Sequence, residues 1–191
     1  MSVSDSYSAA QKWLHWTMAV LIVLTIPLGI SLTRFEGSWM DALYELHKSV
    51  GLVLLALAAI RIAVRTRRGA PPLVEGLPAW QRAAAYLSHY ALYVLIMMVP
   101  VTGWAATSIG YPPVRLFWTI PVTLPFAHDE ALSERVYAVH NVLAFTLAGI
   151  VAVHVLAALH HHFGRRDRTL LRMWPGTGGP PALDDSAGPH C

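Results

Sequence analysis

The stretch V-H-N-V-L-A-F-T-L-A-G-I-V-A-V-H, from Val139 to His154, is almost entirely apolar, yet it carries a histidine near each end. It belongs to an apolar run from about 136 to 163, which is long enough for a helix to cross about 30 Å of hydrocarbon. His140 and His154 are 14 positions apart, and on a helix this spacing gives a rise of about 21 Å and a rotation roughly 40° short of four turns. We therefore expect both imidazoles on nearly the same face of one helix, one near each membrane surface.

The composition is that of a small integral membrane protein. Of 191 residues, 55% are hydrophobic and 13% are charged, and the mean hydropathy is +0.47. The single cysteine, Cys191, is the last residue, which excludes an internal disulfide framework, a cysteine-ligated iron–sulfur cluster and the C-x-x-C-H attachment of a c-type haem. Any bound cofactor is therefore expected to be held through histidine. The N-terminus has no basic region followed by an apolar one, so we expect no cleaved signal peptide.

Three further apolar runs have the length of a membrane-crossing helix. The four spans lie at about 13–32, 43–64, 83–107 and 136–163. The sequence thus predicts an all-α integral membrane protein, a four-transmembrane-helix bundle formed by a single domain over 1–175. A Gly/Pro-rich segment over 176–191 is expected to be a flexible cytoplasmic tail. The connection over about 108–135 is expected to be ordered by its prolines and aromatic residues.

The basic residues predict the orientation of the bundle, because loops rich in Lys and Arg stay on the cytoplasmic side. The N-terminal flank, the connection between the second and third spans and the C-terminal region contain ten Lys or Arg residues, and the other two connections with their flanks contain four. Both termini are therefore expected in the cytoplasm. The R-T-R-R run over 65–68 is interpreted as a topology signal that contacts lipid headgroups, and no nucleic-acid binding is expected.

This orientation sorts the histidines by depth. His47 and His140 fall near the outer surface, whereas His15, His89 and His154 fall near the inner one. A histidine inside a membrane needs a partner, and low-spin b-type haem takes two neutral imidazoles on opposite sides of its iron. We therefore predict two haem b groups.

Depth determines one of the two pairings. The outer haem is expected between His47 and His140, whereas depth alone leaves His154 free to pair with His15 or with His89. Gly51 and Gly149 are expected to leave room for the macrocycles. The cluster His160, His161 and His162 lies at the inner interface, where we interpret it as a set of histidines that reach toward lipid headgroups; a quinone-binding or proton-relay role for one of them is the alternative.

Several of these features together resemble the bacterial cytochrome b561 family. They are the H-W pair at His15, the early His47 of the second span, the 14-residue spacing of His140 and His154, and the ending L-H-H-H-F…T-L-L-R-M-W-P. The resemblance covers about 11–175 and implies a four-helix, di-haem protein of the bacterial inner (cell) membrane. It implies that His15 and His154 hold the inner haem iron and that His47 and His140 hold the outer one, which leaves His89 beside the inner ligands or on the side of a quinone.

The resemblance is closest to the short, stand-alone members of the family, and it implies an oxidoreductase that oxidises periplasmic superoxide to oxygen and reduces ubiquinone. Superoxide is a small anion that is guided by charge, and Lys48, Arg115 and Arg135 form a candidate cationic approach to the outer haem. The alternative is that these cations pair with neighbouring carboxylates such as Glu45. Two other functions are alternatives: a haem b electron-transfer subunit that links a dehydrogenase partner to the quinone pool, and a histidine-based metal transporter.

Overall fold

The structure is a computed structural model that describes residues 6–35, 37, 39–110 and 112–176. The predicted tail beyond 176 lies outside the described residues. Long helices account for most of the described chain: α1 (Ala9–Leu32), α2 (Met40–Arg68), α3 (Ala79–Gly110) and α4 (Glu130–Leu159). All four are long and apolar enough to cross a membrane, which confirms the predicted four-helix membrane fold.

Local sequence signals explain where the helices begin and end. Ser8 and Gln11 form a capping box at the start of α1, in which each side chain bonds the backbone of the other residue. The side chain of Asp129 accepts a hydrogen bond of 2.9 Å from the Leu132 amide at the start of α4. Gly69 ends α2 with a φ of +68°, a backbone conformation that favours glycine. Three of the four helices therefore start or stop at a short-range signal outside their apolar runs.

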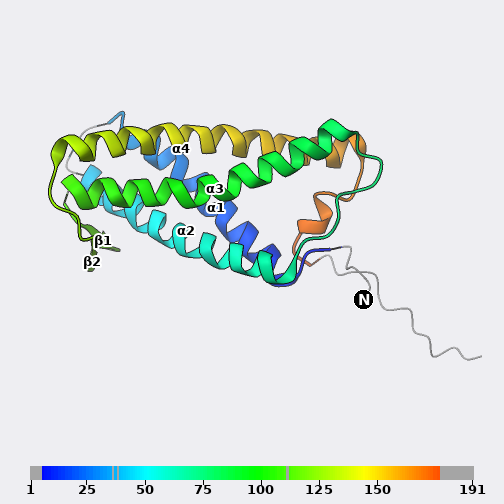
Figure 1. Cartoon of the computed structure of the whole chain (residues 1–191), viewed down its shortest axis with the longest axis horizontal. Helices are drawn as coiled ribbons and strands as arrows, with labels where there is room; N and C mark the ends of the chain where they lie inside the picture. Colours follow the sequence, from blue (N-terminus) through cyan, green and yellow to red (C-terminus); the bar gives the residue numbers. More distant parts are fainter. Residues whose placement is uncertain (1–5, 36, 38, 111, 177–191) are drawn as a thin grey trace, which may run out of the picture.

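The helices run along the long axis of the molecule, with α1 packed on α2, α2 on α3 and α3 on α4 (Figure 1). Met18, Leu54 and Ala58 form a buried core between α1 and α2. In the part of the chain that is described, α1 and α4 are not packed closely against each other. Large apolar side chains such as Leu24 and Leu156 are exposed on the outside of the bundle, as a helix in contact with lipid requires.

The two ends of the bundle differ (Figure 1). One end carries a hairpin of β1 (Val114–Leu116) and β2 (Ile120–Val122). This hairpin gives order to the connection between α3 and α4, as expected, although the strands themselves were not predicted. The other end holds both ends of the described chain, where the Tyr7 amide bonds the Arg172 carbonyl at 3.4 Å. The N- and C-terminal segments therefore share one end of the bundle, and its cytoplasmic placement stays a prediction from charge.

The C-terminal motif folds back onto the start of α1. After α4 the chain continues as a π-helix, η1 (His160–Arg165), and a short 3-10 helix follows, η2 (Leu171–Met173). The indole of Trp16 donates a hydrogen bond of 2.9 Å to the Met173 carbonyl and packs edge-on against Trp174. The M-W dipeptide thus fixes the residue next to His15.

One histidine of the His160–His162 cluster has a structural partner. The Nδ1 of His161 lies 2.5 Å from the Asp167 carboxylate, which also accepts a hydrogen bond of 2.9 Å from the Thr169 amide. Burial opposes ionisation of Asp167, but the hydrogen bonds from His161 and Thr169 outweigh it and lower the pKa of this carboxyl to about 2. His161 therefore helps to close the turn that follows η1.

Candidate functional site

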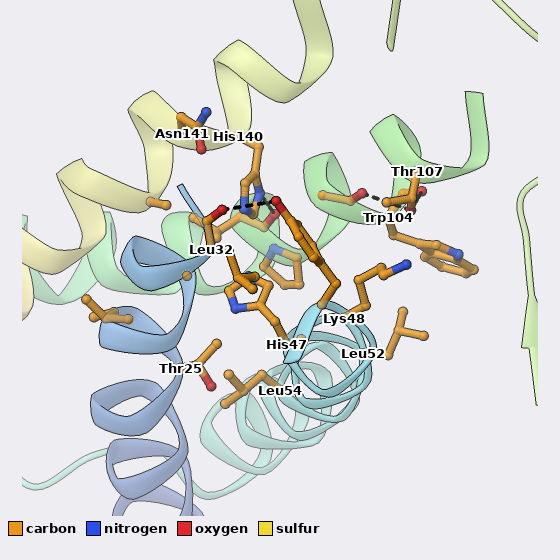
Figure 2. Close-up of a pocket in the computed structure, with 18 of the residues that line it drawn as sticks. Thr25, Leu32, His47, Lys48, Leu52, Leu54, Trp104, Thr107, His140 and Asn141 are labelled. Carbon is orange, nitrogen blue, oxygen red and sulfur yellow. Dashed lines mark hydrogen bonds between the residues drawn. The ribbon is translucent and has the colours of Figure 1, made fainter. Parts of the chain in front are cut away.

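A cavity of about 750 Å³ opens between the four helices near the hairpin end of the bundle. His47 from α2 and His140 from α4 both point into it (Figure 2). Their ring centroids are 6.4 Å apart and their ring planes are nearly perpendicular. The structure therefore brings together the outer pair of histidines that the depth argument predicts.

The neighbouring helix α3 holds the ring of His140 in place. The Nδ1 of His140 lies 2.9 Å from the carbonyl of Val99. A carbonyl can only accept, so Nδ1 carries the proton and Nε2 keeps its lone pair. This is the usual arrangement of a metal-binding imidazole, whose other nitrogen donates to a backbone carbonyl or a carboxylate.

Glycine makes this close approach possible. A Cβ on Gly103, four residues after Val99, would lie 3.0 Å from the Cε1 of His140. The same arrangement recurs at His47, whose Cε1 would lie 2.8 Å from a Cβ on Gly29 of α1. The backbone of Thr25, four residues before Gly29, interacts with His47, although among the described residues the buried Nδ1 has no partner at hydrogen-bond geometry.

Gly29 and Gly103 were not predicted to be site residues. Gly51 and Gly149 were expected to leave room for the macrocycles instead, and of these Gly51 does line the cavity. The proposal for Gly149 is wrong: Gly149 is exposed and does not line the cavity. Nine residues separate it from His140, which corresponds to about half a turn of helix phase, so Gly149 faces away from the histidine.

A second group of imidazoles lies toward the terminal end of the bundle. His15 of α1 and His154 of α4 have ring centroids 6.2 Å apart. His89 of α3 also approaches His154, with a centroid distance of 5.4 Å. Its Nδ1 bonds the Ala85 carbonyl of its own helix at 2.6 Å, and the side chain is exposed. The structure therefore brings both candidate partners to His154.

The donor sets fit b-type haem. Two imidazoles that bind one metal ion from opposite sides, each at about 2.0–2.1 Å, have ring centroids roughly 6 Å apart. The outer pair at 6.4 Å and the inner pair at 6.2 Å both match this spacing. Within the described ranges, no group of three or more His, Cys, Asp or Glu side chains is arranged to hold a metal ion. Each histidine pair therefore fits a metal ion whose remaining ligands come from a macrocycle, as in haem.

In the predicted cationic approach, a neighbouring carboxylate compensates one of the three positive charges. Lys48 lines the cavity, but its ammonium lies 2.5 Å from Oε1 of Glu45. Oε2 of the same carboxylate accepts a hydrogen bond of 2.9 Å from the Arg115 amide. The side chains of Arg115 and Arg135 are exposed. Of the three predicted cations, Lys48 thus has its charge compensated by a neighbour.

Comparison with known proteins agrees with this geometry. The family model described as "Prokaryotic cytochrome b561" matches residues 6–176. The chain belongs to this family. Membership makes it a membrane cytochrome b, an electron-transfer protein that uses b-type haem and spans the bacterial inner membrane several times.

Relatives of similar length extend across nearly the whole chain. "Cytochrome b561 homolog 2" of Escherichia coli K12 is 28% identical over 172 residues, which are 88% of this chain and 91% of the relative. "Probable superoxide oxidase CybB" of Yersinia pestis is 30% identical over 174 residues, 88% of this chain and 96% of the relative. "Cytochrome b562" of Cereibacter sphaeroides is 28% identical over 179 residues, 91% of this chain and 98% of the relative.

Proposed function

We propose that this protein is a di-haem oxidoreductase that oxidises superoxide on the outer side of the membrane and reduces ubiquinone. In the balanced reaction, two superoxide anions give up one electron each and leave as oxygen. One ubiquinone takes up these two electrons together with two protons and leaves as ubiquinol. When bound, b-type haem supplies the one-electron transfer that links the two half-reactions.

The observation that carries the proposal is the presence of one facing imidazole pair toward each end of the same bundle. We assign His47 and His140 as the ligands of the outer haem iron, and His15 and His154 as those of the inner one. The Nδ1 contact of His140 with Val99 leaves its Nε2 free for iron. Since α4 supplies one ligand to each pair, its helical phase sets the path of the electrons across the bilayer.

We assign His15 rather than His89 as the inner partner of His154. The 5.4 Å centroid distance between His89 and His154 is shorter than the roughly 6 Å that a metal held between two imidazoles requires. The side chain of His89 is also exposed on a helix that is apolar enough to span the membrane, so a quinone dissolved in the lipid would have access to it. We place His89 on the quinone side, where its unprotonated Nε2 is a site for proton exchange.

Two observations support superoxide as the donor. The Yersinia pestis relative, which is aligned along most of both chains, is named a probable superoxide oxidase. The exposed Arg115 and Arg135 are close in sequence to Val114 and Tyr137, which line the cavity that His47 and His140 share, and they supply positive charge on this side, whereas Glu45 compensates Lys48. Transfer of an electron from superoxide needs no general base, so positive charge and access are what the donor side must provide.

Stopped-flow mixing of the purified, haem-loaded protein with superoxide tests this function. We expect reduction of the b-type absorption band on mixing, and reoxidation when ubiquinone is added. A chain that stays oxidised with superoxide but is reduced by a dehydrogenase partner would instead be the electron-transfer subunit considered above. A reduced-minus-oxidised spectrum without a b-type band would overturn haem binding itself.

A further inference from the structure

Arg61 of α2 is a half-buried cation inside a membrane-spanning helix, about two turns before the end of α2. Its Nη2 lies 3.2 Å from the Nδ1 of His15. Its Nη1 donates a long hydrogen bond of 3.4 Å to the Gln11 carbonyl, and the side chain of Tyr93 also contacts it. This guanidinium is therefore directed at one of the three inner histidines.

The contact with His15 conflicts with the role proposed for that residue. Guanidinium has only donors. Facing Arg61, the Nδ1 of His15 must accept, which places the proton of the neutral ring on Nε2. An imidazole that binds iron through Nε2 carries its proton on Nδ1 instead. Two donors would then face each other, so the guanidinium needs a different acceptor when His15 is a ligand.

The described residues offer Arg61 no carboxylate. Ion pairs in this part of the chain join Lys48 to Glu45 and both His161 and Arg165 to Asp167. Asp167, which lies at the same end of the bundle as Arg61, is thus already bound. A charged side chain within a membrane faces the bundle interior and is paired with an opposite charge or with backbone carbonyls. The long bond to the Gln11 carbonyl and the contact with Tyr93 leave several of the five donors of Arg61 available for an anion.

We propose that Arg61 binds a carboxylate of the inner haem, one of the two propionates that the macrocycle carries. This inference rests on the proposed ligation of that haem by His15 and His154. The guanidinium touches the ring of His15, so a macrocycle held by that ring would be the nearest source of an anionic group. Arg61 is a positioning residue: it offsets the propionate charge, orients the macrocycle, and frees the Nδ1 of His15 to donate elsewhere.

The experiment compares haem with its dimethyl ester, in which both propionates are neutral. It uses the full chain with His140→Ala, whose remaining haem is the inner one. With Arg61 present, the protein should bind haem about tenfold or more tightly than the ester, since a hydrogen bond to a charged group contributes about 1.5–3 kcal/mol. In Arg61→Gln this preference should largely disappear, and the midpoint potential of the inner haem should fall because a nearby positive charge is lost.

Arg65→Gln is the matched control, because Arg65 lies one turn further along α2 and donates to the Gly69 carbonyl at 3.4 Å. It should keep the preference for haem over the ester. Equal affinity for haem and ester in the protein that retains Arg61 would overturn the proposal, even if Arg61→Gln does not fold. So would a preference that survives in Arg61→Gln. An Arg61-dependent rise in stability with phosphatidylglycerol vesicles but no ester effect would also overturn it, since the anion would then be a lipid phosphate.

A separate measurement checks the assumption beneath the proposal. His15→Ala in the same His140→Ala background should contain no haem. Retention of the haem there would show that the ligand assignment of the proposed function is wrong, whatever Arg61 does. The alternative outcome is that His15→Ala loses haem while the protein that retains Arg61 binds haem and ester equally. His15 would then remain the proposed ligand, and only the role of Arg61 would be wrong.

Discussion

At the scale of single residues, hydrogen bonds to Nδ1 decide what each imidazole can bind. The Nδ1 of His140 lies 2.9 Å from the Val99 carbonyl and therefore carries the proton, which leaves the lone pair of Nε2 available to the iron that we propose it binds. We expect His140→Ala to lower the haem content from two per chain to one, because the proposed inner pair, His15 and His154, does not include this residue. A pyridine haemochrome assay per mole of purified protein measures this ratio. Loss of both haems, or of neither, would contradict the pairing.

His89 provides the complementary prediction. Its ring lies closer to His154 than that of His15 does, but its Nδ1 is bound to its own helix at 2.6 Å and its side chain is exposed. We expect His89→Ala to keep both haems and to slow the reduction of ubiquinone, because only proton exchange near the quinone is impaired. Haem content and the rate of quinone reduction are measured on the same preparation. A drop to one haem would make His89 the inner ligand in place of His15.

Gly103 determines whether the outer ligand can reach its position. In Gly103→Ala the new methyl group would lie 3.0 Å from the Cε1 and Nδ1 of His140, a distance at which the ring must shift. We expect this variant to lose outer haem and to unfold at a lower temperature, with a cost of about 1–3 kcal/mol for overpacking. Gly149→Ala on α4 is the control, since nothing lies within 4 Å of a Cβ there, and it should keep both haems.

At the scale of elements, the sequence predicted the four helices and the shared face of His140 and His154 on α4. It did not predict which helices approach each other closely, or at which residues. The apolar runs, together with the 14-residue spacing of His140 and His154, are local patterns that one sequence displays. The roles of Gly29 and Gly103 depend on which helix lies beside which, and at what rotation. Both glycines look like ordinary packing residues of membrane helices until α1 is placed beside His47 and α3 beside His140.

The attachment of the hairpin to α2 can also be tested by substitution. Ser49 of α2 is fully buried and accepts a hydrogen bond of 2.8 Å from the Phe117 amide in the hairpin turn. We expect Ser49→Ala to lower the free energy of unfolding by about 1–3 kcal/mol, because the Phe117 amide loses its hydrogen-bond acceptor. Thermal unfolding in detergent and protease cleavage within 112–128 measure the effect. Thr123→Ala, at an exposed position just after β2, should change neither, and equal sensitivity in both variants would mean that Ser49 does not anchor the hairpin.

At the scale of the whole molecule, the balance of charge at the two ends decides how an anion is attracted. The hairpin end holds four Lys or Arg residues, as the sequence predicted, but its described carboxylates number five: Asp41, Glu45, Asp129, Glu130 and Glu134. The net charge of this end is therefore close to zero or slightly negative, so its average field does not draw superoxide from a distance. Attraction must come from individual cations that are not compensated by a neighbouring carboxylate.

If individual cations attract superoxide, two substitutions that each remove one charge should have opposite effects on the rate at which superoxide reduces the protein. Glu45→Gln removes the partner of Lys48 at the edge of the cavity, so it should speed the reduction of the protein by superoxide. Arg135→Gln removes an exposed cation and should slow it. Stopped-flow rates at rising ionic strength check the cause, because the Debye length is about 10 Å at 0.1 M salt and shortens further above it. Both differences should shrink as salt is added. If Glu45→Gln slows the reaction, or if the salt dependence is the same in all three proteins, these cations do not guide superoxide.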